Sequence, residues 1–256
     1  MLIFGDDRSH SRPAGVIVSK TLVITQSNYI PWRGYFDLLS SADEVVLLDC
    51  VQYTRRDWRN RNRIKTANGP VWLTIPVETK GRYDQAIDET RIANSDWIQS
   101  HIRSIEVAYR GAAHYQALAP WLFDVMAEIR EEPFLTKVNA RLLRAFCRRL
   151  DIDVALTQCT DLLERGALRS MDPTARLVQL AKAAGASRYL SGPAAKDYLD
   201  VAAFEREGIE VAWMDYSGYP EYPQLWGGFE PFVSIVDLVL NVGDRAAKQY
   251  LAGAAR

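Results

Sequence analysis

Cysteine and histidine are both scarce in this chain, which has 256 residues and only three of each. The cysteines, Cys50, Cys147 and Cys159, are scattered and show no CxxC spacing. The sequence therefore predicts neither a disulfide framework nor a zinc site. The scarcity of histidine also disfavours a His-centred catalytic triad. Metal binding by Asp or Glu side chains remains an open alternative. We predict no metal site and identify no cofactor.

Long apolar runs and an excess of one charge are lacking as well. No segment approaches the roughly 18 uninterrupted apolar residues of a membrane helix, and charged residues interrupt the first twenty positions, where a secretion signal needs an apolar centre. The formal net charge is -1, which disfavours DNA binding. We expect a cytoplasmic protein without a membrane partner. Residues 1–20 are predicted to be a leader and residues 21–256 a single domain.

The first half of the domain is typical of an α/β fold. Residues 21–25 read TLVIT and residues 44–48 read EVVLL, two buried strands with a helical stripe between them that begins near Pro31. This pattern predicts a β-α-β unit with a parallel sheet. Residues 26–29 and 49–53 follow the two strands, so we expect them to share the rim where α/β proteins bind ligands.

The rest of the chain extends this architecture. Asn68-Gly69 between two extended segments predicts a hairpin arm, and helical periodicity over residues 96–109, 115–129 and 133–150 predicts a helical insertion at about 95–150. Further strands are expected near 155–157, 188–190 and 209–214, with a helix over 172–184 between the first two and another helix that begins near Ala194. The last helix should begin at Ser234, with Asp237 completing a capping box. The fold class predicted is α/β, with a Rossmann-like, mainly parallel sheet.

The segment from Arg55 to Lys65 is the strongest local signal for a ligand. Six of its eleven residues are basic. The repulsion between these charges would be offset by a bound anion, and phosphate is the natural one. Trp58, Asn60 and Asn62 lie between the charges and suggest contact with a base or sugar. A solvated strand edge and an RNA-binding arm are the alternatives.

Three other segments could carry chemistry. Residues 26–37 offer Gln, Asn and Tyr hydrogen bonds, although the aromatic side chains there could equally be core. Asp49 could act as a general base, bind a cation or pair with an arginine, whereas no motif links Cys50 to a histidine. The turn from Ser191 to Lys196 could hold an anion or be an ordinary capped turn. The loop over 216–237 could close on a ligand or simply pack.

The motifs and their order resemble the WbqC-like protein family. The similarity covers roughly residues 22–243 and rests on Q-x-x-Y-x-P-W-x-G-Y-F-D, then L-D-x-V-Q-Y-x-x-R-D-W-x-N-R-N-R-I, then Y-L-S-G, Y-P-Q and S-I-x-D-L-x-x-N-x-G. The resemblance implies a bacterial protein associated with O-antigen and other surface glycans, and transfer of glycine or another acyl group to an amino sugar. The chain departs from the family pattern at Tyr219, where a histidine is expected, and at Cys50, where an acidic residue is expected.

The leading hypothesis is an acyl or aminoacyl transferase that forms an amide on an amino sugar, a nucleotide sugar or a small amine. Asp49 is the expected base, and Arg61 or Arg63 would stabilise the oxyanion. The acyl donor would be held on a carrier protein, a tRNA or coenzyme A. The alternatives are a phosphate-ligand binding or assembly protein without turnover, and an RNA-binding protein. The side chains expected to bind substrate are Gln26, Asn28, Tyr29, Trp32, Tyr35, Gln52, Tyr53, Arg56, Trp58, Asn60, Asn62, Ser191, Gly192, Lys196, Tyr219, Tyr222, Gln224 and Asp237.

Overall fold

The computed structural model describes residues 19–251, and the predicted leader lies almost wholly outside this range. A five-stranded sheet forms its centre, in the order β5-β2-β1-β6-β7, with every neighbouring pair parallel. The strands are β1 (Thr21–Thr25), β2 (Glu44–Leu47), β5 (Ala155–Gln158), β6 (Arg188–Ser191) and β7 (Glu210–Trp213). Because β1 is followed by β2 on one side and flanked by β6 on the other, the sheet is doubly wound. The predicted Rossmann-like parallel sheet is confirmed.

The central strands are apolar on both faces because both faces are covered by helices. Val23, in β1, lies opposite Val45 of β2 and Leu190 of β6. All four residues of β2 are buried. Such strands read as continuous runs of β-branched and aliphatic residues rather than as an alternation, which is why TLVIT and EVVLL could be recognised.

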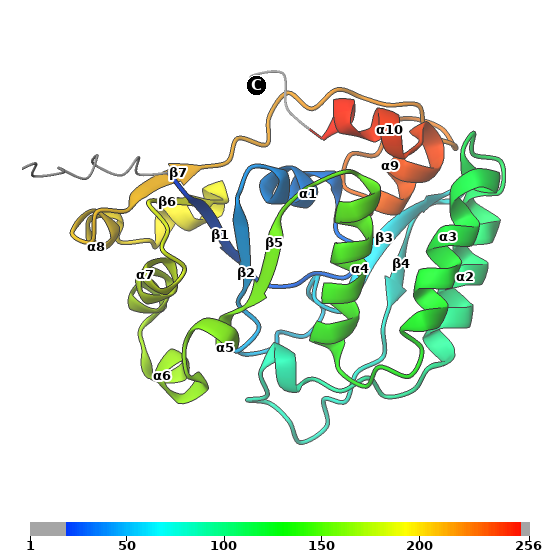
Figure 1. Cartoon of the computed structure of the whole chain (residues 1–256). Coiled ribbons are helices and arrows are strands. Elements are labelled where there is room, and N and C mark those ends of the chain that lie inside the picture. The colour runs from blue at the N-terminus through cyan, green and yellow to red at the C-terminus, as the bar shows by residue number, and fades with distance from the viewer. Residues whose placement is uncertain (1–18, 252–256) are drawn as a thin grey trace, which may run out of the picture.

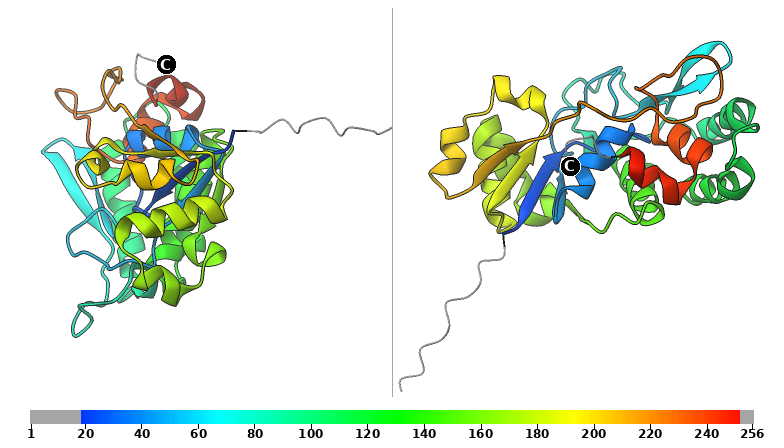
Figure 2. Two further views of the ribbon diagram at one scale, coloured as in Figure 1. Left: turned by 90° about the vertical axis from the view of Figure 1, so that its left-hand side faces the viewer. Right: turned by 90° about the horizontal axis from the view of Figure 1, so that it is seen from above.

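The helices form two layers around the sheet, as Figures 1 and 2 show. Leu22, Ile24 and Val46 point into a core shared with α7 and α8, whereas Val23 and Val45 point into the larger core under α1, α4 and α9. The helices around the sheet are α1 (Arg33–Ser40), α4 (Leu135–Arg149), α5 (Cys159–Leu162), α6 (Arg165–Ser170), α7 (Pro173–Ala183), α8 (Val201–Glu205), α9 (Ile235–Val242) and α10 (Asp244–Ala247). Within residues 19–251, every helix is too short or too polar to span a bilayer.

A hairpin and three helices separate β2 from β5, as predicted. The hairpin pairs β3 (Arg61–Thr66) with β4 (Gly69–Thr74), and Gly69 adopts a φ of 95° at the turn, a conformation that glycine tolerates best. It is followed by the 3-10 helix η1 (Ile87–Glu89) and then by α2 (Asp96–Tyr109) and α3 (Tyr115–Glu128), which lie beside α4 on the far side from α7 (Figure 1).

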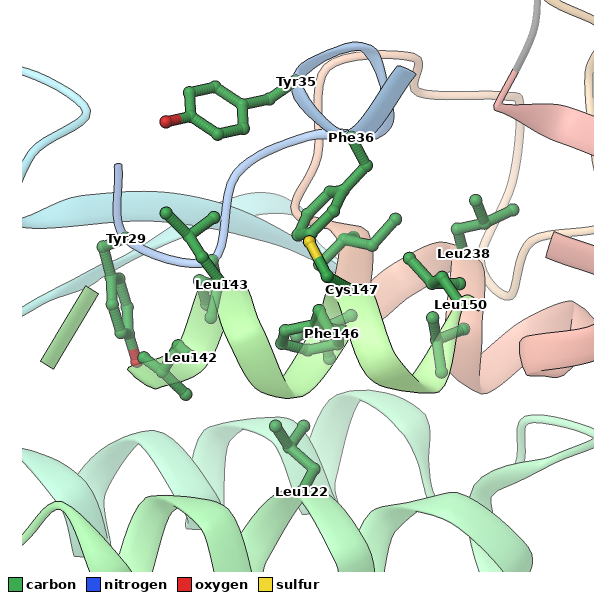
Figure 3. Close-up of a cluster of buried hydrophobic side chains, with 14 of the residues drawn as sticks. Tyr29, Tyr35, Phe36, Leu122, Leu142, Leu143, Phe146, Cys147, Leu150 and Leu238 are labelled. Carbon is green, nitrogen blue, oxygen red and sulfur yellow. The ribbon is translucent and has the colours of Figure 1, made fainter. Parts of the chain in front are cut away.

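Helix α4 is the centre of the larger core. Its apolar residues recur at helical spacing, and Figure 3 shows Leu142, Phe146 and Leu150 projecting from it between the helices that surround them. Phe146 contacts Phe36 of α1 at a ring-centroid distance of 5.8 Å and Trp121 of α3 at 5.3 Å. One helix thus joins the sheet layer to the α2–α3 pair.

Two local predictions are corrected by the structure, and two short helices are added to them. Ser234 does cap α9, its hydroxyl accepting a hydrogen bond from the Val236 amide, but Asp237 takes no part in a capping box because its carboxylate is used by tertiary partners. The helix expected from Ala194 is a 3-10 turn, η2 (Pro193–Asp197), followed by α8. Helices α5 and α6 were not foreseen, since four to six residues are too few to show a period.

Burial of His101 makes the stability of the fold depend on pH. His101 lies in α2 between Trp97 and Tyr29, and its Nδ1 is 2.8 Å from the Tyr29 hydroxyl. Burial lowers the pKa of His101 to about 4. A histidine in an unfolded chain titrates near 6.5, so the unfolded state binds more protons than the folded state between these values. The free energy of unfolding should therefore fall as the pH drops through this window.

We expect this single group to remove about 2 kcal/mol of stability between pH 7 and pH 5. Denaturant unfolding of the wild type and of His101→Asn at both pH values checks this, because the difference between the proteins isolates the histidine from other titrating groups. An identical pH dependence in the two proteins would show that His101 does not titrate in this way.

Candidate functional site

A pocket of about 680 Å³ opens at the carboxyl ends of the central strands. We call it the inner pocket. It is bounded by Gln26 and Asn28 after β1, by Leu48 after β2 and by Ser191 and Gly192 at the end of β6. Because the chain leaves β1 and β6 in opposite directions, the loops diverge and leave a crevice at this switch point, where doubly wound sheets bind their ligands.

Arg59 is the cation that projects into the inner pocket from the hairpin side. Its Nη1 donates a hydrogen bond to Asn28 Oδ1, and its Nη2 donates one to Gln26 Oε1. Both partners are neutral amides, and the nearest carboxylate oxygen, of Asp57, lies 3.6 Å away. The guanidinium is thus fixed in direction while its charge is only partly offset.

The charges along the inner pocket are positive. Arg59 and Arg176 line it, and among the described residues no aspartate or glutamate does. Arg176 is held by backbone carbonyls, its Nε 2.6 Å from Leu168 O and its Nη2 2.9 Å from Met171 O. Two fixed guanidiniums, of which Arg59 is paired with Asp57 from outside the lining, favour an anionic ligand, and phosphate suits the planar donor geometry.

Aromatic side chains supply much of the remaining wall. Trp32, Tyr35, Trp58, Tyr189 and Tyr198 line the inner pocket. The Tyr35 hydroxyl donates to Gln26 O at 2.9 Å, and burial raises its pKa. Burial also raises the pKa of Tyr189 to about 12. Both phenols therefore stay protonated and act as hydrogen-bond donors at neutral pH.

Asp49 supports this site from behind. It is fully buried at the end of β2; its Oδ1 accepts from the Ser27 amide at 2.8 Å, and its Oδ2 accepts from the Thr136 hydroxyl of α4. Burial raises the pKa of Asp49, and hydrogen bonds from Thr136 and Ser27 oppose the shift. Residues 26–29 and 49–53 do meet, as expected from the sequence. The carboxylate of Asp49 does not line the pocket. Its role as a general base stays a prediction.

Asn139 of α4 completes the support. Its Nδ2 donates to the Arg59 carbonyl at 2.9 Å and to Ser27 Oγ at 3.2 Å. The same amide therefore ties the segment that carries Arg59 to the segment that carries its two partners. Helix α4 fixes the clamp from inside the core.

Several side chains expected to bind substrate make hydrogen bonds within the fold, and of these Asn62 also lines a second pocket, described below. Asn62 donates to the carbonyls of Tyr29 and Ile30, at 3.1 and 3.0 Å, and so holds Ile30 in a left-handed conformation with φ of 34°. Asn60 donates to Ile75 O at 2.8 Å. Asn62 thus secures the hairpin against the loop after β1, Asn60 joins the two ends of the hairpin, and the Tyr29 hydroxyl pairs with His101 of α2.

The loop before α9 holds a second group of predicted residues. Asp237 is buried and accepts hydrogen bonds of 2.8 Å from Tyr109, Tyr222 and Gln224. Lys65 donates to Gln224 at 2.9 Å. Asp237 therefore fixes this loop to α9 through Tyr222 and Gln224, and Lys65 fixes it to the hairpin through Gln224. None of Tyr222, Gln224 and Asp237 lines the inner pocket.

The remaining predicted residues are dispersed. The Tyr219 hydroxyl is 2.5 Å from Asp37 Oδ2, and Lys196 is exposed with its Nζ 5.8 Å from the Trp213 ring centroid. Gln52 and Tyr53 line a separate pocket of about 420 Å³. Arg56 is exposed, with a φ of 59°.

A second pocket, of about 410 Å³, adjoins the inner one and contains Arg63. We call it the outer pocket. It shares Asn28, Trp32 and Trp58 with the inner pocket and adds Phe232. Arg61 lies close by, its Cζ 4.1 Å from the Trp72 ring centroid.

Other features do not converge on these pockets. A larger pocket, of about 740 Å³, includes the ion pair of Lys248 and Asp151 at 2.6 Å and contains none of the side chains predicted to bind substrate. Cys50 is buried outside both pockets. A hydrogen bond from the Cys159 thiol lowers the pKa of Cys50.

The structure therefore brings together part of the predicted set and adds residues that were missed. Gln26, Asn28, Trp32, Tyr35, Trp58, Ser191 and Gly192 meet at the inner pocket. The missed residues are Arg59, Arg176, Tyr189 and Tyr198. Arg59 lies within the basic run but at a variable position of the motif D-W-x-N-R-N-R, whereas nothing near Arg176 distinguishes it from a solvated helical arginine.

Fold and site together define a doubly wound α/β protein with a positively charged pocket at its switch point. The chain belongs to the WbqC-like protein family, whose model matches residues 26–249. It is 48% identical over 228 residues to the uncharacterized protein Rv1507c of Mycobacterium tuberculosis. The aligned region covers 89% of this chain and 96% of that protein. No solved structure matches the chain significantly.

Replacing Asp49 separates its structural contacts from a catalytic role. Asp49→Ala should leave the buried Ser27 amide unpaired and lower the free energy of unfolding by about 1–3 kcal/mol. Asp49→Asn keeps an acceptor for that amide and should cost less, which denaturant unfolding measures. If Asp49 is the general base, turnover in Asp49→Asn should fall at least about a hundredfold, whereas a positioning residue would retain most turnover. Equal destabilisation by Ala and Asn would contradict the hydrogen-bond arrangement.

Proposed function

We propose that the protein is an acyl or aminoacyl transferase, with glycine as one candidate group, that acts on the amine of an amino sugar, a nucleotide sugar or a related small molecule. The observation that carries the proposal is the clamp on Arg59. A guanidinium held by two neutral amides, in a pocket without lining carboxylates, is suited to the phosphate of a nucleotide-linked or phosphorylated acceptor. The resemblance to the WbqC-like family, which implies an association with O-antigen and other surface glycans, supports an amino sugar as the acceptor.

The wall of the inner pocket suits such an acceptor in other ways. Tyr35, Tyr198 and Trp32 give the lining an aromatic surface suited to a sugar, and Tyr198 is exposed. Ser191 and Asn28 offer short polar groups. In the reaction, the acceptor nitrogen forms a bond to the donor's acyl carbon and the bond from that carbon to the donor's oxygen or sulfur breaks. The proton lost by the amine passes to the departing oxygen or sulfur, so that the donor leaves as an alcohol or a thiol. An arginine beside the reacting carbonyl would stabilise the oxyanion, and Arg63, which lines the adjoining pocket, is the predicted group placed there.

The acyl donor would enter from the side of the hairpin, attached to a carrier protein, a tRNA or coenzyme A. These activated donors and nucleotide sugars are made in the cytoplasm, where we place the reaction. A protein that binds the same ligand without turnover is the second candidate. The specific observation in its favour is that the described lining of the inner pocket contains no histidine or carboxylate to accept the amine proton.

Arg59→Ala tests the binding step. We expect the affinity for uridine diphosphate, used as a probe for nucleotide-linked acceptors, to fall about 10- to 100-fold, since a hydrogen bond to a charged group is worth about 1.5–3 kcal/mol. Isothermal titration calorimetry measures this change. Arg55→Ala is the matched control: it removes a charge from the same basic run, but Arg55 is exposed, bonds to Thr79 O and lines neither the inner nor the outer pocket.

Equal losses in the two variants would mean that general charge, not the clamp, attracts the anion, and would contradict the proposal. Turnover is then assayed with aminoacyl or acyl donors by mass spectrometry of the amide product. Tight ligand binding with no product from any donor class would favour the protein without turnover. An RNA-binding protein would instead show affinity that falls steeply with salt.

A further inference from the structure

We propose that the outer pocket binds a nucleobase, stacked between two pairs of aromatic side chains. This inference deepens the proposed function, because it assigns a nucleotide to the ligand whose phosphate Arg59 would hold. The pocket is lined by three aromatic side chains, Trp32, Trp58 and Phe232, together with Arg63. Trp58 and Phe232 are 40% and 56% exposed, so their rings are open to a partner.

Each aromatic wall is a packed pair and not a single loose ring. Trp58 lies against Trp72 at a ring-centroid distance of 5.3 Å and an interplanar angle of 42°. Trp32 lies against Phe232 at 5.7 Å and 53°. A planar base that enters between the pairs would find ring faces already in place, which reduces the entropy lost on binding.

The backbone near these rings is also fixed. Arg63 Nη2 donates to Phe232 O at 3.0 Å, and the Ser234 amide donates to Arg63 O at 2.8 Å, so the hairpin and the loop before α9 are joined across the pocket. The Trp58 carbonyl accepts from the Tyr29 amide at 3.0 Å. Exposed aromatics on such a fixed frame indicate a binding surface rather than a displaced core.

Charge distinguishes this pocket from a purely apolar one. The Arg61 guanidinium lies over Trp72, and Arg63 Cζ is 5.7 Å from the same ring. Arg63 has a carboxylate, of Glu230, at 3.8 Å. Guanidiniums beside stacked aromatic rings are the combination that recognises a base together with its phosphate. Because the two pockets share Asn28, Trp32 and Trp58, one nucleotide could place its base in the outer pocket and its phosphate at Arg59.

The nucleotide could be part of the acceptor or of the donor, and two probes separate these sources. Uridine diphosphate stands for a nucleotide-linked acceptor, and adenosine 3′,5′-bisphosphate stands for the nucleotide end of a coenzyme A donor. Pyrophosphate serves as the same type of anion without a base. Phe232 is the position to change, because it lines the outer pocket and not the inner one. Its side chain is exposed, so we expect its replacement to leave folding intact.

Phe232→Ala should weaken binding of at least one nucleotide about tenfold or more, as expected for the loss of a stacking face, and should leave pyrophosphate affinity unchanged. Phe232→Tyr should restore binding, whereas Phe232→Leu, which retains apolar volume without a ring, should not. Tyr83→Ala is the control, since Tyr83 is 79% exposed and lines neither pocket. Calorimetry gives the affinities, and quenching of tryptophan fluorescence on binding gives an independent sign of stacking.

The nucleotide that depends on Phe232 identifies which substrate carries the base. The proposal is overturned if neither nucleotide depends on Phe232, if nucleotide and pyrophosphate lose affinity equally, or if single-stranded RNA binds far more tightly than both and loses affinity in Arg61→Ala. Arg59→Ala keeps the two proposals apart: a nucleotide affinity that falls in Phe232→Ala but not in Arg59→Ala supports the outer pocket while contradicting the Arg59 site.

Discussion

The hydrogen bond from the Ser27 amide to buried Asp49 is the constraint on which the site depends. It joins the loop after β1 to the end of β2, and the second carboxylate oxygen joins both to α4 through Thr136. Gln26 and Asn28 flank Ser27, so their side chains are directed by an anchored backbone. Arg59 is then held by those side chains, and the charge of the pocket acquires a fixed position. A group that lies behind the pocket wall thereby sets the direction of the cation that lines it.

The segment between β2 and β5 supplies what the sheet lacks. A doubly wound sheet alone provides the crevice at its switch point, with backbone and small polar groups around it. The hairpin and its preceding loop bring Trp58 and Arg59 across that crevice, and Asn139 of α4 bonds to the Arg59 carbonyl. The loop before α9 is fixed to the hairpin by Lys65, which donates to Gln224, and it brings Phe232 to the outer pocket. The site thus combines segments distant in sequence around one end of the sheet.

The sheet could be predicted because its signals are local. TLVIT and EVVLL show continuous burial, and Asn68-Gly69 shows the hairpin. The site was harder to predict, because a polar side chain next to a strand can face a ligand or the core. Asn60 and Asn62 alternate with arginines, a pattern that suggests amides facing a ligand. In the structure, both amides donate hydrogen bonds to backbone carbonyls. Asp237 lies at the position of a capping residue, but its carboxylate accepts a hydrogen bond from Tyr109, which is 128 residues away in the sequence. Conversely, Arg176 reaches the inner pocket only through the packing of α7 against the sheet.

The origin of the rings around the Arg59 clamp has a consequence for how specificity can evolve in this architecture. Trp58 precedes Arg59 in the chain, and Trp32 lies on the same loop as Gln26 and Asn28, so these two rings are tied to the clamp itself. Phe232 comes from the loop before α9, which carries neither Arg59 nor its two amide partners. Substitutions at Phe232 can therefore alter the outer pocket while the clamp and the strands of the central sheet keep their sequence.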